Sequence, residues 1–509
     1  LCTYRIANFK TASADKDAGA AFLKYKDFKP YVDYFNSMED ENIAQAIPNA
    51  RASQWMEENI PLFECSQKNF EEMYYYRWWT LRKHIKETPV GYGMTEFLVN
   101  RSYADKYNLI ACAIGHHIYE SRWLRNPEYL NQIIHTWYRG NEGGPMAKMT
   151  KFSSWNADAV LGRYMVDGNK EFLLDMVKDL EAEYARWEKT NRLPNGLYWQ
   201  GDVQDGMEES ISGGRRKQYA RPTINSYMYG NAKALSLIGI MTGDEGMAMK
   251  YGLKADSIKT LVQDKLWNTD HHFFETMRGD ASAEVREAIG YIPWYFNLPD
   301  ASSKYTVAWK EVMDEKGFSA PYGLTTAERR HPEFRTHGVG KCEWDGAIWP
   351  FASAQTLTAM ANFMNNYPQT VLTDSVYFHH MERYVESQHH RGRPYIGEYL
   401  DEVTGYWLKG DQERSRYYNH STFNDLMITG LIGLRPRMDN TVEVNPLIPE
   451  GKWDYFCLDN VLYHGRNLTI LWDKDGSRYQ RGKGLHIYVD GKEVGHADTL
   501  TRVLCENVL

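Results

Sequence analysis

The sequence is poor in the features that mark several large classes of protein. Its six cysteines are scattered through 509 residues and none belongs to a Cys-x-x-Cys pair, so we expect neither a zinc ribbon nor a thiol-redox motif. No run of about 18 apolar residues is present, which argues against a membrane-spanning helix. A net charge of −8 gives no basic surface for nucleic acid. No Gly-rich phosphate loop and no nucleophile elbow stands out.

The histidines are poorly placed for metal binding. Half of the 16 occur as adjacent pairs, and adjacent residues of a helix do not share a face. We therefore expect no metal and no cofactor. The pairs are His116-His117, His271-His272, His379-His380 and His389-His390.

Aromatic residues, by contrast, are abundant. The chain holds 16 Trp and 36 Tyr, and aromatic residues make up 14% of it. Tyr and Trp join an apolar face to a polar edge, which suits a cleft that stacks on sugar rings as well as an aromatic-rich helical core. With 43% hydrophobic and 25% charged residues, the composition is that of a globular protein.

Helical periodicity dominates from about residue 103 to residue 434. In the stretch SYADKYNLIACAIGHHIYESRWL, apolar residues recur at steps of three and four, the spacing of one helix face. Turns with Gly and Pro, such as RLPNGL and SAPYGL, separate the segments. The pattern predicts an all-α domain of stacked helical hairpins. Further helices are expected near residues 70–85, 169–189, 223–243, 246–266, 303–315, 350–366, 370–389 and 418–433, and an extended segment near 93–100.

The pattern changes after residue 435. The stretches NTVEVNPL, NVLYHGRNLTILWD and GLHIYVDGKEV alternate apolar and polar residues. In the third, Leu485, Ile487 and Val489 share one face, and an Asp-Gly turn follows, which is typical of a β-hairpin. We predict a small β-sandwich-like module over residues 436–509.

Six short motifs follow one another between about residues 60 and 435: EEMYYYRWW, SSWNADAV, DGMEES, CEWDGAIWPFASAQTL, IGEYLDEVTG and YYNHSTFNDLMITGLIGLRPR. Together they resemble the inverting glycosidases of the trehalase and glycoside hydrolase family 63 superfamily, which includes processing glucosidase and mannosylglycerate hydrolase. The resemblance implies an all-α (α/α)6 barrel, a six-hairpin toroid, with the small β-module at its C-terminal side. We accordingly expect an N-terminal segment at residues 1–69, the catalytic barrel at 70–435 and the β-module at 436–509.

Glycoside hydrolysis needs two carboxyl groups across the scissile bond. In inverting enzymes one donates a proton to the leaving oxygen and the other activates a water, at a separation of about 6.5–9.5 Å. The family places the acid directly after a Gly–apolar pair, which here implies Glu208 as the general acid. Family members more often carry Asp there, and Asp205 is the next candidate, followed by Glu209 and Asp202.

The general base is expected late in the helical domain. Family members carry a Glu shortly before a Thr-Gly turn that leads into an aromatic helix start. Glu398 precedes such a turn here, so the resemblance implies Glu398 as the general base. Asp401 and Glu402 compete by proximity, but they fall in the turn itself, where acidic residues are common.

The acid-bearing loop runs directly into a helix. Pro222 suits the first turn of a helix, where its missing N–H costs nothing. Arg221 and Asn225 are therefore expected at the mouth of the barrel, beside the acid loop, and Asp205 would tune the proton donor or bind hydroxyls.

The resemblance also implies a set of sugar-binding side chains. Asp345 would accept hydrogen bonds from hydroxyls while Trp344 or Trp349 stacks, and the alternative is a helix-capping Asp with two core Trp residues. Arg77 offers fixed donors for hydroxyls or a carboxylate, or else lies between core aromatics. The full set is Arg77, Trp78, Trp155, Asn156, Asp158, Asp205, Arg221, Asn225, Trp344, Asp345, Trp349 and His420.

We predict an exo-acting inverting glycosidase that removes a terminal sugar from an oligo- or polysaccharide. α-Glucosides and α-mannosides follow from the named families, and side chains of plant glycans, including β-L-arabinofuranosides, are the alternative. A polysaccharide lyase on a helical toroid, which needs a Tyr or His base, and a non-catalytic carbohydrate-binding protein remain open. The expected partner is a carbohydrate, with no nucleic acid or membrane, and the oligomeric state is open. A periplasmic or secreted location is favoured, although no signal peptide is visible.

Overall fold

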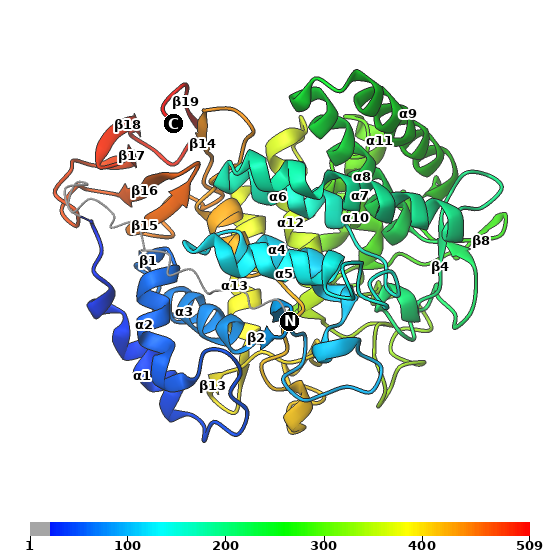
Figure 1. Cartoon of the computed structure of the whole chain (residues 1–509), viewed down its shortest axis with the longest axis horizontal. Coiled ribbons are helices and arrows are strands. Elements are labelled where there is room, and N and C mark those ends of the chain that lie inside the picture. Colours follow the sequence, from blue (N-terminus) through cyan, green and yellow to red (C-terminus); the bar gives the residue numbers. More distant parts are fainter. Residues whose placement is uncertain (1–20) are drawn as a thin grey trace, which may run out of the picture.

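The computed structural model describes residues 21–509. Helices fill the part of the chain up to about residue 431, and the long strands follow (Figure 1). The helices are α1 (Lys29–Ser37), α2 (Asn49–Asn59), α3 (Lys68–Lys83), α4 (Ile114–Ser121), α5 (Pro127–Arg139), α6 (Asn156–Asp167), α7 (Lys170–Asn191), α8 (Pro222–Thr242), α9 (Glu245–Leu261), α10 (Ile292–Tyr295), α11 (Ser303–Thr306), α12 (Pro350–Asn366), α13 (Asp374–Ser387) and α14 (Asn424–Leu426).

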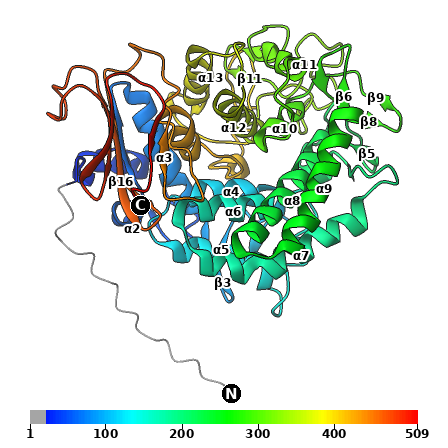
Figure 2. The same cartoon turned by 90° about the horizontal axis from the view of Figure 1, so that it is seen from above.

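Six helices contact one another in a closed cycle. Helix α4 contacts α6, α6 contacts α8, and α8 contacts α10. The cycle continues from α10 to α12 and from α12 to α14, and α14 contacts α4 again. Figure 2 shows α4, α6, α8, α10 and α12 following one another around the domain, with the strands of the C-terminal part at one side. A cavity of the helical domain is lined mainly by the loops that join these helices, with Phe351 of α12 the one described lining residue that lies within the cycle.

A second set of helices covers the first. Helix α7 contacts α6 and α8, α9 contacts α8, and α13 contacts α12 and α3. Helix α8 is buried on nearly all sides up to Gly239, as expected for a helix that is apolar all round and lies in the interior of a domain.

The boundary between α8 and α9 follows from local sequence. Pro222 occupies the first turn of α8, where it is pre-set for a helix. Gly243 ends α8 at φ 73°, and its Cβ-free backbone accepts this left-handed conformation. The side chain of Asp244 then caps α9 by accepting a hydrogen bond from the Met247 N–H at 2.9 Å. The helices predicted near 223–243 and 246–266 are thus confirmed, the latter with a π-helical last turn.

Two predicted helices are shorter than expected, and both predictions were wrong in extent. Within the stretch 102–124 only α4 is α-helical, because Tyr107 and Asn108 have φ of 62° and 65°, which a right-handed helix does not include. Within 418–433 only α14 and a following π-helical turn are helical. Three backbone N–H groups at the start of α14 donate to the carboxylate of Glu120, which fixes the helix start at this point.

The C-terminal part forms a five-stranded antiparallel sheet in the order β1-β15-β16-β17-β18, together with the pair β14-β19. The Asp490-Gly491 turn joins β17 and β18 with Val489 opposite Lys492, so the predicted hairpin is confirmed. The strands are β1 (Leu62–Cys65), β14 (Val442–Val444), β15 (Tyr455–Tyr463), β16 (Arg466–Asp473), β17 (Gly484–Val489), β18 (Lys492–Ala497) and β19 (Val503–Cys505).

Short strand pairs punctuate the helical part. They are β2 (Ile85–Thr88) with β3 (Gly91–Met94), β10 (Ser319–Ala320) with β11 (Gly323–Leu324), β12 (His389–His390) with β13 (Arg393–Pro394), β6 (Trp267–Asn268) with β7 (Phe273–Phe274), and the sheet β4 (Trp199–Gln200), β5 (Tyr219–Ala220), β8 (Met277–Arg278) and β9 (Ala281–Ser282).

Strand β1 links the two ends of the described chain. It lies between α2 and α3, yet its partner is β15, with Phe63 opposite Leu458. A further tie is the ion pair between Glu64 and Arg478 at 2.7 Å. The division of the chain at residues 69 and 435 stays a prediction. Over residues 21–509, none of the helices is both long and apolar enough to cross a membrane.

Candidate active site

A cavity of about 340 Å³ opens where loops from distant parts of the helical domain meet. Its walls hold three carboxyl groups, those of Glu96, Glu208 and Glu398, and we call it the carboxyl cavity. Of the four acids between residues 202 and 209, Glu208 is the one that lines it. The two glutamates predicted as acid and base therefore face the same cavity.

Glu208 lies on a loop whose backbone is held by its own side chains. The carboxylate of Asp202 accepts hydrogen bonds from Val203 N at 2.8 Å and Glu209 N at 3.3 Å. Gly206 has φ 71°, and a Cβ added there would lie 2.8 Å from the sulfur of Cys112. The loop therefore needs glycine at this point, and this turn directs the next residues toward the cavity.

The environment of Glu208 favours the neutral acid. Removal from water raises the pKa of its carboxyl group to about 7, and the negative charges of Asp202 and Glu398 add to the effect. A carboxyl group with this pKa keeps its proton near neutral pH and can donate it.

Glu398, in contrast to Glu208, has positively charged side chains and a hydroxyl group beside its carboxyl group. Two cations lie beside its carboxylate, Lys409 with Nζ at 3.5 Å and Arg414 with Nη2 at 3.3 Å from Oε2. The hydroxyl of Ser415 donates to the same oxygen at 3.2 Å. Two backbone hydrogen bonds between Ile348 and Leu400, of 3.0 and 2.9 Å, fix the backbone two residues after Glu398. Two cations and a hydroxyl donor therefore surround this carboxyl group on the side of Oε2.

Glu96 is a third carboxyl group that sequence reasoning missed. The hydroxyl of Tyr418 donates to its Oε1, whereas its buried Oε2 has no hydrogen-bond partner. Burial raises the pKa of Glu96 to about 8, and the charges of Glu208 and Glu398 contribute. The available signal was an acidic residue inside the apolar stretch GMTEFLVN, because an acid in such a run is seldom fully buried without a role.

Aromatic and cationic side chains complete the walls. Within residues 21–509, neither Arg101 nor Lys151 forms an ion pair with a carboxylate. The guanidinium of Arg101 lies over the rings of Phe97 and Tyr103 at 5.3 and 5.4 Å, and Lys151 donates to the Tyr103 carbonyl at 3.2 Å. The aromatic residues of the wall are Tyr103, Phe152, Trp349, Phe351 and Tyr418.

Of the predicted sugar-binding residues, Trp349 and His420 line the carboxyl cavity. Trp344 and Asp345 do not line it. Trp344 stacks on Trp349 with ring centroids 4.6 Å apart. Asp345 accepts from the backbone N–H groups of His337 and Gly338 at 2.6 and 2.9 Å. Since α12 begins after Trp349, Asp345 is neither a helix cap nor a cavity residue and instead holds a loop. Burial lowers the pKa of His420 well below its usual range, so its ring is neutral.

Asp205, Arg221 and Asn225 form the support of the acid loop and do not line the carboxyl cavity. The Arg221 guanidinium donates from Nε to Asp205 at 2.6 Å, and both side chains are fully buried. Asn225 donates to the Tyr198 and Arg221 carbonyls, each at 2.8 Å. The expectation that Arg221 and Asn225 lie at the mouth of the barrel was therefore wrong, because both side chains are fully buried and their polar groups are satisfied within the protein.

Trp155, Asn156 and Asp158 also lie away from the carboxyl cavity. Trp155 is fully buried against Tyr227, with centroids 4.8 Å apart. Asn156 donates to Glu183 at 3.0 Å. Asp158 accepts from a tyrosine hydroxyl and lines a separate cavity of about 220 Å³.

Arg77 and Trp78 are buried in α3 and do not line the carboxyl cavity. Arg77 donates to Gln388 at 2.8 Å and to the carbonyl and hydroxyl of Ser421 at 2.9 Å each. Ser421 follows His420, so Arg77 positions a cavity segment without facing the cavity. Trp78 packs edge-on against Tyr74.

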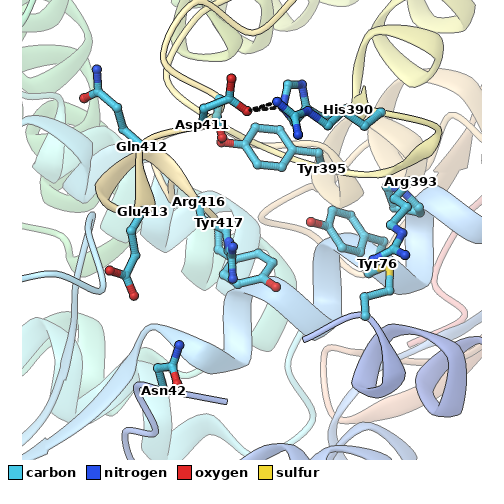
Figure 3. Close-up of a pocket in the computed structure, with 14 residues that line it drawn as sticks. Asn42, Tyr76, His390, Arg393, Tyr395, Asp411, Gln412, Glu413, Arg416 and Tyr417 are labelled. Carbon is cyan, nitrogen blue, oxygen red and sulfur yellow. Dashed lines mark hydrogen bonds and ion pairs between the residues drawn. The ribbon is translucent and has the colours of Figure 1, made fainter. Parts of the chain in front are cut away.

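A larger cavity of about 660 Å³ lies on the other face of the segment 410–417 (Figure 3). Arg416 lines this larger cavity, whereas Arg414 lines the carboxyl cavity. The two carboxyl groups of the larger cavity, Asp411 and Glu413, are both exposed, and a hydrogen bond from the Tyr406 hydroxyl lowers the pKa of Asp411. In the described range 21–509, no three His, Cys, Asp or Glu residues stand together as metal ligands.

Comparison with known proteins gives two family matches. A family model described as the mannosylglycerate hydrolase MGH1-like glycoside hydrolase domain matches residues 106–421. A second, the C-terminal domain of glycosyl hydrolase family 65, matches residues 434–496.

Solved structures match this chain at two levels of sequence identity, 82% and 10–12%. A structure named "Sialidase" is 82% identical with a TM-score of 0.96, over 97% of this chain and 46% of that one. The chain thus spans about half the length of that protein.

At 12% identity and a TM-score of 0.52, the GH63 mannosylglycerate hydrolase from Thermus thermophilus in complex with glucose matches over 70% of this chain and 99% of its own. A GH78 family rhamnosidase of Bacillus sp. GL1 has 10% identity and a TM-score of 0.55, over 81% of this chain and 40% of its own. These two matches show the fold.

The family match covers more than half of the chain and includes Glu208 and Glu398. It supports the glycosidase hypothesis over the polysaccharide lyase and the non-catalytic binding protein. The chain belongs to the family of mannosylglycerate hydrolase MGH1-like glycoside hydrolase domains, so residues 106–421 form a glycoside hydrolase domain.

Proposed function

We propose that the protein is an exo-acting glycosidase that works by a single displacement with inversion. The closed cycle of helices is, in this proposal, the inner ring of an (α/α)6 barrel, residues 70–435 form the catalytic unit and residues 436–509 a β-module that supports it. The substrate is a terminal sugar of an oligo- or polysaccharide.

The observation that carries the proposal is the contrast between two carboxyl groups in one cavity. Glu208 is kept neutral by burial up to about pH 7, and Glu398 is flanked by Lys409 and Arg414. When two carboxyl groups experience such different environments, one serves as acid and the other as base. Glu208 would protonate the leaving oxygen, and Glu398 would take a proton from the water that attacks the anomeric carbon on the opposite face.

The enclosure by aromatic side chains favours action at a chain end. A cavity of about 340 Å³ lies at the small end of the range for ligand sites and suits a single sugar ring better than a chain passing through. We propose α-glucosides, α-mannosides or side-chain sugars of plant glycans, including β-L-arabinofuranosides, as the substrate class.

The stereochemistry of the product tests the mechanism. A panel of aryl glycosides and plant oligosaccharides, extended to rhamnosides and sialosides, identifies the substrate, and proton NMR within the first minutes of reaction reads the anomer. We expect the first-formed sugar to have the configuration opposite to that of the substrate. A product of retained configuration would refute the single displacement.

The pH dependence tests the assignment of the acid. Glu208 must be protonated to donate, and the pKa of its carboxyl group is about 7, so we expect kcat/KM to fall as pH rises through about 7. On an aryl glycoside with a strongly acidic leaving group, which needs no proton, this decline should disappear. An equal decline on both substrates would point to another group.

A further inference from the structure

The carboxyl group of Glu96 has a place in the cavity that neither acid nor base catalysis uses. Its backbone is fixed, since its carbonyl accepts from Asn419 N at 2.9 Å and the preceding Thr95 N donates to the His84 carbonyl at 3.0 Å. Its side chain is 3% exposed and lines the same cavity as Glu208 and Glu398. The group is therefore rigid and adjacent to the proposed reacting atoms.

The two oxygens of Glu96 are unequally satisfied. Oε1 accepts the hydrogen bond of the Tyr418 hydroxyl, and Oε2 is buried without any partner in the described part of the chain. An unpaired polar atom in a protein interior destabilises the folded state, so its persistence beside a ligand cavity points to a partner that comes with the ligand.

The charges in the cavity determine which role Oε2 plays. Two carboxyl groups, those of Glu208 and Glu398, raise the proton affinity of Glu96, and burial has the larger effect. Three cations, Arg101, Lys151 and Arg414, line the same walls, yet within residues 21–509 none of them hydrogen-bonds to Glu96. A carboxyl group held neutral in this way is a hydrogen-bond donor.

We propose that Glu96 is a sugar-binding residue that donates a hydrogen bond from its protonated carboxyl group to a hydroxyl oxygen of the sugar at the cleavage site. This inference rests on the proposed glycosidase function and deepens it. Tyr418 holds one oxygen of the carboxyl group, so the proton lies on the other, buried oxygen, and in this proposal the sugar hydroxyl reaches it from the cavity. Glu96 thereby selects sugars that carry a hydroxyl at this position.

Variants of one residue separate this role from a structural one. With the glycoside that the wild type cleaves, we expect Glu96→Ala to lower kcat/KM about tenfold, the worth of one such hydrogen bond, mainly through KM. Glu96→Gln keeps neutrality and a donor, and it should remain within about threefold of wild type. Tyr418→Phe should also remain close to wild type. If Tyr418→Phe reproduces the loss and Glu96→Gln does not restore it, Glu96 acts only through Tyr418 and the inference is wrong.

Deoxy substrates provide a test that does not depend on folding of any variant. One deoxy analogue of the sugar should lose about tenfold in kcat/KM with the wild type, and no further loss should follow when that analogue meets Glu96→Ala, because both changes remove the same bond. Additive losses at every position would overturn the inference.

The two proposals fail in different ways. Turnover by the wild type with an unaltered kcat/KM in Glu96→Ala rejects the role of Glu96 alone. Absence of turnover on every glycoside rejects the proposed function, and saturation-transfer NMR with monosaccharides then decides on Glu96. Binding that is weakened by Glu96→Ala and kept by Glu96→Gln supports its role, whereas binding that is unchanged, or absent in the wild type, contradicts it.

Discussion

Replacing Glu208 by Gln removes the proton donor and should lower kcat about 100- to 10,000-fold on a glycoside with a poor leaving group, the usual contribution of a general acid. The loss should shrink on an aryl glycoside whose phenol leaves without protonation. Replacing Glu398 by Gln should give a loss of the same size on both substrates, because the water must be activated whatever the leaving group. Steady-state kinetics on the two substrates separates the roles.

Glu209→Gln is the matched control. Glu209 is the next residue in the same loop and its carboxylate pairs with the exposed Arg215 at 3.1 Å, outside the carboxyl cavity. We expect kcat of this variant within about twofold of wild type, since surface pairs contribute little. If Glu209→Gln were inactive and Glu208→Gln active, the general acid would have to be assigned to Glu209 in place of Glu208.

The second large effect concerns stability. Arg221 and Asp205 form a fully buried ion pair at 2.6 Å, and the hydroxyls of Ser153 and Thr223 also donate to Asp205. Arg221→Met leaves the carboxylate of Asp205 buried beside neutral donors only, and removal of one partner of such a pair costs about 3–5 kcal/mol. Urea unfolding followed by circular dichroism should show a midpoint shifted to lower urea.

Arg391→Met makes the same substitution in an exposed pair. Arg391 contacts Asp411 at 2.7 Å, and the two side chains are 71% and 52% exposed. A change within about 1 kcal/mol is expected there. The double variant Arg221→Met with Asp205→Asn should recover part of the lost stability, since the unpaired charge is then gone. If Arg221→Met and Arg391→Met lowered the free energy of unfolding equally, the buried pair would contribute no more to stability than the exposed one.

The fold was readable from the sequence wherever local rules suffice. Helix α8 starts at a proline and ends at a glycine, and the Asp-Gly hairpin of β17 and β18 is specified by its turn. The failures lie where tertiary contacts override periodicity. Residues 418–423 have a helical pattern, but Glu120, about 300 residues earlier in the chain, captures the N–H groups that mark the helix start.

The site was readable only in part. Glu208 and Glu398 stand in motifs, and both face one cavity, although their catalytic roles remain a proposal. Glu96 belongs to none of the motifs. Its proposed role depends on a hydrogen bond from Tyr418, which is 322 positions away in the sequence. Arg221 and Asp345 failed as ligand-binding predictions for a similar reason, because a polar side chain next to a motif shows its partners only in three dimensions.

The pairing of β1 with β15 also has a consequence for biosynthesis. Strand β1 leaves the ribosome well before its partner, and the whole helical part is translated between the two. Until β15 arrives, the edge of β1 has open N–H and C=O groups, the kind of edge that invites aggregation. A nascent chain that stalls or is cut between the helices and β15 would carry this exposed edge, so the pairing of β1 with β15 can form only after the helical part between the two strands has been translated.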